Sequence, residues 1–184
     1  MKNLIIAFIF IVTHIGSVDG QTPATPVKSA SVSQMEIFKP WQGHWQGEGT
    51  MNRYGQQQKF QINEHIEMKL DGTILTIEGI GKDTQAGEEK IVHHAFGVLN
   101  FDETQNHYGF KTYLADGKST IAWFKVIDAS TYQWGFDVPT GKVRYDIRVN
   151  HQAGTWDEKG EFSSDGNTWY PFLQMQLKKV NAKK

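Results

Sequence analysis

The chain has 184 residues, of which 39% are hydrophobic and 21% charged, and its formal net charge at pH 7 is −1. This balance is typical of one globular domain and excludes an intrinsically disordered chain. The near-zero charge argues against binding to nucleic acid, and the absence of cysteine excludes disulfides and thiolate metal sites.

The first twenty residues have the pattern of a secretory signal peptide. Lys2 supplies a positive charge, and the mainly apolar segment from Leu4 to Ile15 is too short to span a bilayer. Val18 and Gly20 are small residues spaced as a signal peptidase requires, so cleavage is expected to leave Gln21 as the new N-terminus. Because no cysteine follows for lipid attachment, we predict a secreted or periplasmic protein that is not inserted in the membrane after cleavage.

The composition then divides the chain into a linker, a domain and a tail. Residues 21–32 are rich in Thr, Pro, Ser and Ala, which predicts a flexible linker. The folded domain is expected to span residues 33–180. Residues 181–184 end in two lysines and are expected to form a disordered basic tail.

The predicted domain begins with a short helical turn and continues entirely as strands. Ser33 is expected to cap a turn that reaches Phe38, with Glu36 three residues later as in a capping box and Pro40 beyond its end. Segments rich in β-branched and aromatic residues follow, several of them with apolar and polar residues in alternation, which predicts strands. These segments begin at Gly43, Gln57, Thr73, Lys90, His107, Lys118, Thr131, Lys142, Thr155 and Asn167.

Short turns connect the predicted strands. Asp71-Gly72, Asp116-Gly117 and Asp165-Gly166 are hairpin signals, because a type I′ turn needs positive φ at both central positions. Strands joined by short links pair antiparallel in chain order, which predicts an all-β meander of about ten strands. Closure of that meander into an up-and-down barrel would remove its two exposed edges.

Two short motifs carry a resemblance to known barrels. The segment Gly43-His44-Trp45-Gln46-Gly47-Glu48-Gly49 resembles the Gly-x-Trp opening of calycins, and its longer form resembles nitrobindin-type, fatty-acid-binding-protein-like barrels. The segment from Ser163 to Trp169 resembles the closing hairpin of an uncharacterised group of bacterial exported lipocalin-like domains. The resemblance implies a lipocalin-like barrel whose closed end is plugged by Trp45. The chain departs from it by carrying Lys178 and Lys179 where lipocalins have an arginine that stacks on this tryptophan.

The most informative polar residue of the predicted strands is Glu64. It lies between Ile62 and Ile66 on an apolar face, where an ionised group is costly unless it is paired. Arg144 and Arg148 share one face of a later strand and could meet inside the barrel either a ligand's carboxylate or Glu64 itself. The alternative is that both arginines face water while the other face of this strand, formed by Val143, Tyr145, Ile147 and Val149, fills the interior.

These residues lead to a predicted binding site for a small apolar or amphipathic molecule, since ten strands enclose more space than eight. The expected polar anchors are Glu64, Tyr113, Arg144 and Arg148, and the expected apolar wall includes Trp123 and Trp134. Two alternatives stay open. The barrel could be filled by its aromatic residues and act as a structural or interaction module, or Glu64 and a nearby histidine could form an acid/base pair of an enzyme. No catalytic motif spacing is present, so no catalytic residue is assigned.

The histidines are scattered, without the spacing of a metal site. His93 and His94 are adjacent in a predicted strand, so their side chains point to opposite faces. No metal or other cofactor is expected. If haem were bound, His93, His94 or His151 would be its candidate ligands, although nitrobindin-type barrels use a histidine in the C-terminal part and none follows His151 here.

Overall fold

The structure is a computed structural model that describes residues 29–53, 55–85 and 88–181. The expected signal peptide, residues 21–28 of the expected linker and residues 182–184 of the expected tail lie outside the described residues. Among the described residues, no helix is long and apolar enough to cross a bilayer.

A short helical segment opens the described chain, with α1 (Ala30–Met35) followed directly by the 3₁₀ helix η1 (Glu36–Trp41). The side chain of Ser29 caps α1 by accepting a hydrogen bond from the Val32 amide at 3.2 Å. The predicted cap at Ser33 is therefore wrong, because helical backbone already includes this residue and its hydroxyl donates to the Ser29 carbonyl at 3.1 Å. The last three residues of the expected linker thus belong to α1.

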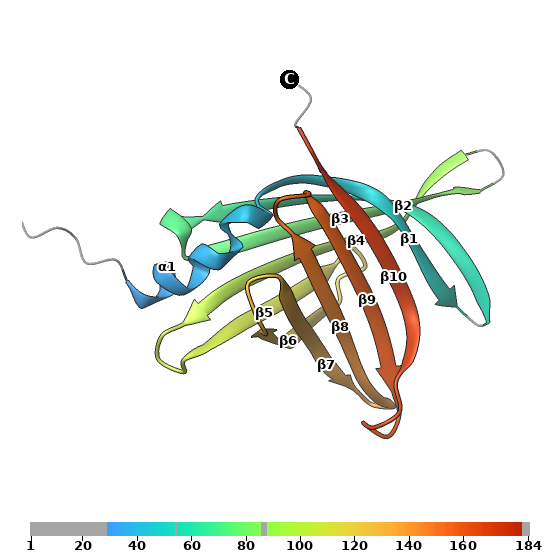
Figure 1. Cartoon of the computed structure of the whole chain (residues 1–184). Coiled ribbons are helices and arrows are strands. Elements are labelled where there is room, and N and C mark those ends of the chain that lie inside the picture. The colour runs from blue at the N-terminus through green and yellow to red at the C-terminus, as the bar shows by residue number, and fades with distance from the viewer. Residues whose placement is uncertain (1–28, 54, 86–87, 182–184) are drawn as a thin grey trace, which may run out of the picture.

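The described residues form ten antiparallel strands that close into a barrel, as the strand pattern predicts (Figure 1). Each strand pairs with its neighbours in the chain, and β1 pairs with β10 to close the sheet. A 3₁₀ turn, η2 (Leu70–Gly72), separates the second and third strands. The strands are β1 (Gly43–Arg53), β2 (Gln56–Lys69), β3 (Ile74–Gln85), β4 (Glu88–Asp102), β5 (His107–Leu114), β6 (Ser119–Val126), β7 (Thr131–Val138), β8 (Gly141–Asn150), β9 (Thr155–Ser163) and β10 (Tyr170–Val180).

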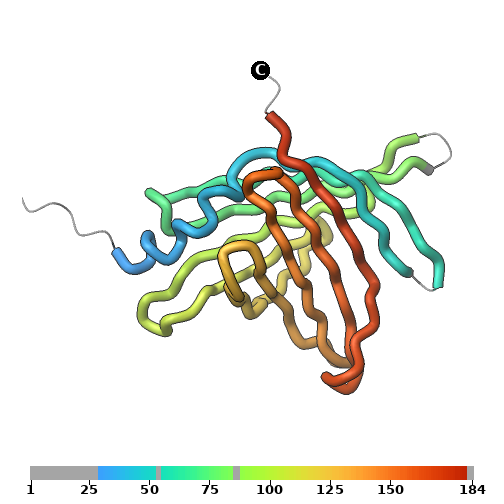
Figure 2. Tube along the Cα trace, viewed as in Figure 1, coloured from blue at the N-terminus to red at the C-terminus, as the bar shows by residue number. Residues whose placement is uncertain are grey.

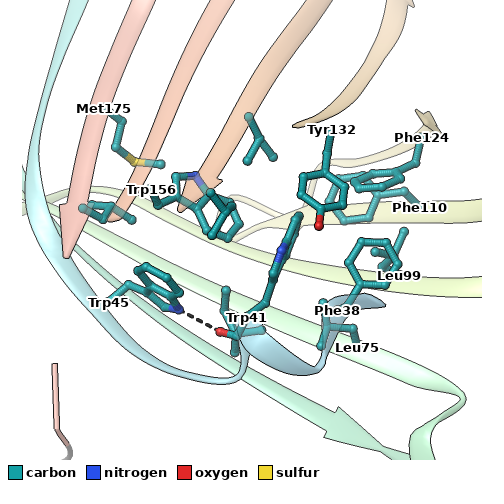
Figure 3. Close-up of a cluster of buried hydrophobic side chains, with 14 of the residues drawn as sticks. Phe38, Trp41, Trp45, Leu75, Leu99, Phe110, Phe124, Tyr132, Trp156 and Met175 are labelled. Carbon is teal, nitrogen blue, oxygen red and sulfur yellow. Dashed lines mark hydrogen bonds between the residues drawn. The ribbon is translucent and has the colours of Figure 1, made fainter. Parts of the chain in front are cut away.

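The helical segment lies across one end of the barrel, where it appears in blue in the tube view (Figure 2). Its Phe38 and Trp41 are fully buried and insert among aromatic rings of the strands (Figure 3). The Trp41 ring lies 4.7 Å from the ring of Tyr132 and 4.4 Å from that of Trp156, both in edge-on geometry. Such contacts bury large apolar surfaces, so the helical segment closes this end of the barrel.

Trp45 is buried at the end of the barrel that the helical segment closes. Its buried ring lies 5.6 Å from that of Trp156, and its Nε1 donates a 2.7 Å hydrogen bond to the Trp41 carbonyl (Figure 3). Lys179 lies with its Nζ 5.4 Å from the centre of the Trp45 ring and donates to the Pro40 carbonyl at 2.7 Å. Lys179 therefore contacts the Trp45 ring as a cation and also fastens the last strand to the helical segment.

The Asp-Gly dipeptides all lie in turns, but only one has the predicted backbone. At Asp71-Gly72 both residues have positive φ. At the other two turns the glycine takes the left-handed conformation, with φ of 88° at Gly117 and 77° at Gly166, whereas the preceding aspartate does not. There the aspartate carboxylate instead accepts backbone hydrogen bonds, as Asp165 does from two amides at 2.7 and 2.8 Å.

The alternation of apolar residues identifies the inner face correctly along most of the barrel. In β2, Phe60, Ile62 and Ile66 are buried. Leu70, which continues the same alternation in the sequence, is 70% exposed because the strand ends one residue before it and its own φ is positive. Trp169 has the same parity as Leu173, Met175 and Leu177, but it precedes β10, and a register shift between Pro171 and Leu173 separates it from their inward face.

Candidate functional site

The buried rings of Phe38, Trp41, Trp45, Tyr132 and Trp156 form an aromatic plug at the end that the helical segment closes. A cavity of about 470 Å³ occupies the barrel between this aromatic plug and the opposite end. Trp41, Phe124 and Trp156 line it on the side of the plug. Lys59, near the start of β2, and Lys118, directly before β6, line it at the other end. The volume lies within the range of pockets that hold small molecules, and the predicted alternative of a barrel filled by its aromatic residues is not the one seen.

The side chain of Glu64 points into this cavity from the middle of β2. The residue paired with Glu64 on β3 is Gly79, which has no side chain. A Cβ atom at Gly79 would lie 2.7 Å from a Glu64 carboxyl oxygen, so the glycine makes room for the carboxyl. Among the described residues, Glu64 makes no hydrogen bond and no ion pair. Burial, together with the charge of Glu158, raises the pKa of Glu64 from 4.5 to about 8.

Glu158 of β9 is the second carboxyl in the cavity. One of its oxygens accepts a hydrogen bond from Trp134 Nε1 at 3.3 Å, and the other accepts one from Trp156 Nε1 at 3.1 Å. Burial raises its pKa from 4.5 to about 7, although the two indole donors favour the ionised form. The charge of Glu158 in turn opposes the ionisation of Glu64.

A flat aromatic surface lies beside the second carboxyl. The rings of Trp134 on β7 and Tyr145 on β8 are stacked, with centres 4.0 Å apart and planes 6° from parallel, and both residues line the cavity. Burial and the charge of Glu158 hold the pKa of Tyr145 above its ordinary value, so its hydroxyl is neutral at physiological pH. Around Glu158 the cavity thus combines apolar walls with the carboxyls of Glu64 and Glu158, the phenol of Tyr145 and the two indole N–H groups that bind Glu158.

The structure brings together two of the residues expected in the binding site, Glu64 and Trp134. Tyr113 and Trp123 do not line the cavity, because the inward positions of β5 and β6 belong to residues such as Phe110 and Phe124. Tyr113 and Trp123 instead lie partly exposed on the outer face, and lysine ammonium groups contact their rings at 4.9 and 5.3 Å.

Arg144 and Arg148 also lie outside the barrel, since the opposite face of β8 carries the inward residues Tyr145 and Ile147. Arg144 donates two hydrogen bonds, from Nε and Nη2, to one carboxylate oxygen of Glu161 at 2.9 and 2.8 Å. Its guanidinium lies 4.0 Å from the centre of the Trp169 ring. The prediction that Arg144 and Arg148 anchor a ligand inside the barrel is therefore wrong. The structure has the alternative arrangement, in which the opposite face of β8 fills the interior.

The candidate histidines are distributed around the barrel. His93 lies on the cavity lining near its mouth, whereas His94 points outward and contacts a Glu78 carboxylate oxygen at 2.9 Å. The ring of His151 contacts the Ala129 carbonyl at 3.0 Å, on an exposed connection. Within the described ranges, no histidine is hydrogen-bonded to Glu64, and no group of three or more His, Asp or Glu side chains could hold a metal ion.

Glu158 and Tyr145 are the members of the site that sequence reasoning missed as polar groups. Strand β9 carries polar residues on both faces, so its charge pattern alone does not indicate the inner face. Trp156 and Phe162 have the same parity as Glu158, and this alternation was the available signal. Applied to β9, it would have placed Glu158 inside the barrel.

Comparisons with known proteins agree with this fold. No family's sequence profile matches the chain, and no curated protein matches its sequence. Among solved structures, Rv2717c from M. tuberculosis is similar with a TM-score of 0.58 and 11% identity, over 80% of this chain and 97% of that one. The S-type phycobiliprotein lyase CPES from Guillardia theta is similar with a TM-score of 0.53 and 11% identity, over 84% of this chain and 94% of that one. At this identity the similarity shows a lipocalin-like barrel fold.

Proposed function

We propose that this protein binds a small, largely apolar molecule inside its barrel. The observation that carries the proposal is the cavity of about 470 Å³, lined mainly by apolar and aromatic side chains, with the partly buried carboxyls of Glu64 and Glu158 facing into it. An apolar pocket with a few convergent polar groups is the common form of a small-molecule site. One similar structure is an S-type phycobiliprotein lyase, but the cavity's own geometry is the stronger support for a binding role here.

Export is a second part of the proposal. It is supported by the residues before the domain, where Lys2, the apolar segment and the small residues Val18 and Gly20 form a signal-peptide pattern. The mass of the protein recovered from the culture medium or the periplasm of its host would test this. A molecular mass equal to that of the chain from Gln21 onward supports export and cleavage, whereas an intact chain retained in the cytoplasm contradicts both.

Native mass spectrometry of the protein purified from its host under mild conditions tests the binding function. We expect a stoichiometric extra mass that is lost on denaturation. A matched variant, Thr112→Trp, places a large ring in the cavity and should abolish the extra mass. Its control, Ile121→Trp, adds the same ring on the next strand at a position that is 82% exposed and should retain it.

The same preparation distinguishes the kinds of ligand. An intense haem absorption band would identify haem, with His93 as the candidate ligand because it lies on the cavity lining. A bare mass, under conditions that preserve the ligand of a known lipocalin-like barrel, would contradict the binding function and favour an interaction module.

A further inference from the structure

We infer that the cavity selects molecules with a basic nitrogen, such as a protonated alkylamine attached to an aromatic ring through a methylene group, and that this nitrogen docks between Glu64 and Glu158. The inference rests on the proposed binding function and adds the chemical class of the ligand.

Within the parts of the chain that the structure describes, no lysine or arginine neutralises the two carboxyls. Neither Glu64 nor Glu158 forms an ion pair with a described residue. The lysines that line the cavity, Lys59 and Lys118, stand at the mouth with exposed side chains, and Lys118 is paired with Asp116. A charged carboxylate in an apolar interior is costly unless a cation accompanies it, so a cationic ligand gains more here than it would in water.

Glu64 is the carboxyl with the most unused capacity to bind a cationic N–H donor of a ligand. Its carboxyl is held in the interior of the barrel, faces the cavity and receives no hydrogen bond from the described residues. Glu158, by contrast, already accepts one indole N–H on each oxygen. Because a carboxylate oxygen has two acceptor positions, both groups can still accept N–H donors from a ligand.

The walls of the cavity favour the same ligand class. The stacked pair of Trp134 and Tyr145 and the ring of Trp156 lie next to Glu158. Aromatic faces attract cations through their negative quadrupole, and tryptophan does so most strongly. They also stack well against a planar apolar ligand.

The arrangement disfavours acidic ligands. The arginines that could have held a carboxylate, Arg144 and Arg148, lie on the outer face of β8. An acidic ligand in the cavity would place its charge beside Glu64 and Glu158, and like charges at close range repel. The ligand preference should therefore be opposite to that of a fatty-acid carrier.

Binding should also be coupled to proton release. A bound cation favours ionised carboxyls, so Glu64 and Glu158 should lose protons when the amine binds, and its affinity should rise between about pH 6 and pH 8. The other ionisable groups that line the cavity are Tyr145, which stays neutral, and Lys59, Asp83, His93 and Lys118 at the mouth.

Three probes of one shape test the inference on the full-length mature protein: naphthalen-2-ylmethylamine, naphthalen-2-ylmethanol and 2-naphthoic acid. Isothermal titration calorimetry at about pH 7.5, in two buffers of different ionisation enthalpy, gives affinity and proton release together. We expect the amine to bind at least about tenfold more tightly than the alcohol, a difference of about 1.4 kcal/mol. The acid should bind most weakly.

The double variant Glu64→Gln/Glu158→Gln should reduce the preference for the amine to about threefold or less and remove the proton release. Binding of the neutral alcohol, which needs no carboxylate, checks that the cavity still forms in this variant. The control Glu48→Gln, on the outside of β1 where the side chain accepts a hydrogen bond from Gln61, should keep the full preference.

The possible failures are distinguishable. If the acid or the alcohol binds as tightly as the amine, or if the preference survives in the double variant, the ligand class is wrong while cavity binding stands. If no probe binds and native mass spectrometry shows a bare protein, the proposed binding function fails as well. If no probe binds but the native ligand lacks a basic nitrogen, the inference alone is refuted.

Discussion

The carboxyl of Glu64 should make the protein less stable as the pH rises from 5 to 7. In the folded state this group keeps its proton up to about pH 8, whereas in the unfolded chain it loses the proton near its ordinary value of 4.5. Between these values the folded state binds more protons than the unfolded state, so raising the pH favours unfolding. The variant Glu64→Gln removes this titration while it conserves the shape of the side chain.

The magnitude follows from the two pKa values. Integrated from pH 5 to pH 7, Glu64 lowers the free energy of unfolding by at most about 2.5 kcal/mol, and Glu158, whose pKa is raised to about 7, adds at most about 2 kcal/mol. Water entering through the mouth of the cavity screens both groups, so these figures are upper values. Even half of this loss is substantial for a domain stabilised by roughly 5–15 kcal/mol.

Urea unfolding followed by circular dichroism at pH 5, 6 and 7 measures the effect. The wild type should lose stability over this range, and Glu64→Gln should lose about half as much. Glu48→Gln, with its side chain in solvent, should follow the wild type. Parallel curves for the wild type and Glu64→Gln would refute the reasoning, because Glu64 would then titrate alike in the folded and unfolded states.

Three further substitutions test other parts of the structure by the same unfolding assay. Arg144→Met should cost roughly 1–3 kcal/mol at pH 7 because it removes two hydrogen bonds from the buried Glu161 carboxylate. Burial raises the pKa of Glu161, but its bonds to Lys159 and Arg144 lower the pKa by more, so the net pKa is below the ordinary value of 4.5 and this cost should shrink below about pH 4.5. An unchanged stability of Arg144→Met at pH 7 would contradict the pairing. Trp45→Ala should lower the free energy of unfolding by about 3–5 kcal/mol, since it leaves a cavity where a buried ring of the aromatic plug was. A loss below about 1 kcal/mol would show that this ring does not stabilise the barrel. Gly141→Ala should be destabilising by at least about 1–3 kcal/mol, because φ is 153° and the new Cβ would lie 2.1 Å from the Ser163 carbonyl oxygen; wild-type stability would show that this turn has another backbone.

The amino-acid sequence by itself determined the architecture of the domain. Alternation of apolar and polar residues marks strands because side chains in a strand point to opposite faces, and the predicted strand starts lie within three residues of those seen. The short links require antiparallel neighbours, and closure follows from the exposed edges of an open meander. The same alternation placed Glu64 on the inner face, where the structure has it.

The tertiary structure alone decided the composition and charge of the site. Glu158 is on β9 and Glu64 on β2, and the two strands come close only because β1 pairs with β10 to close the barrel. Alternation alone left open which face of β8 turns inward. In the structure Arg144 lies on the outer face, where it is the neighbour of Glu161 on β9 and donates hydrogen bonds to it. Local alternation defines two faces for each strand, but long-range pairing decides which side chains from distant strands share the interior. For that reason the sequence predicted a barrel with an inward Glu64, and the structure revealed a second carboxyl, Glu158, that faces the same cavity.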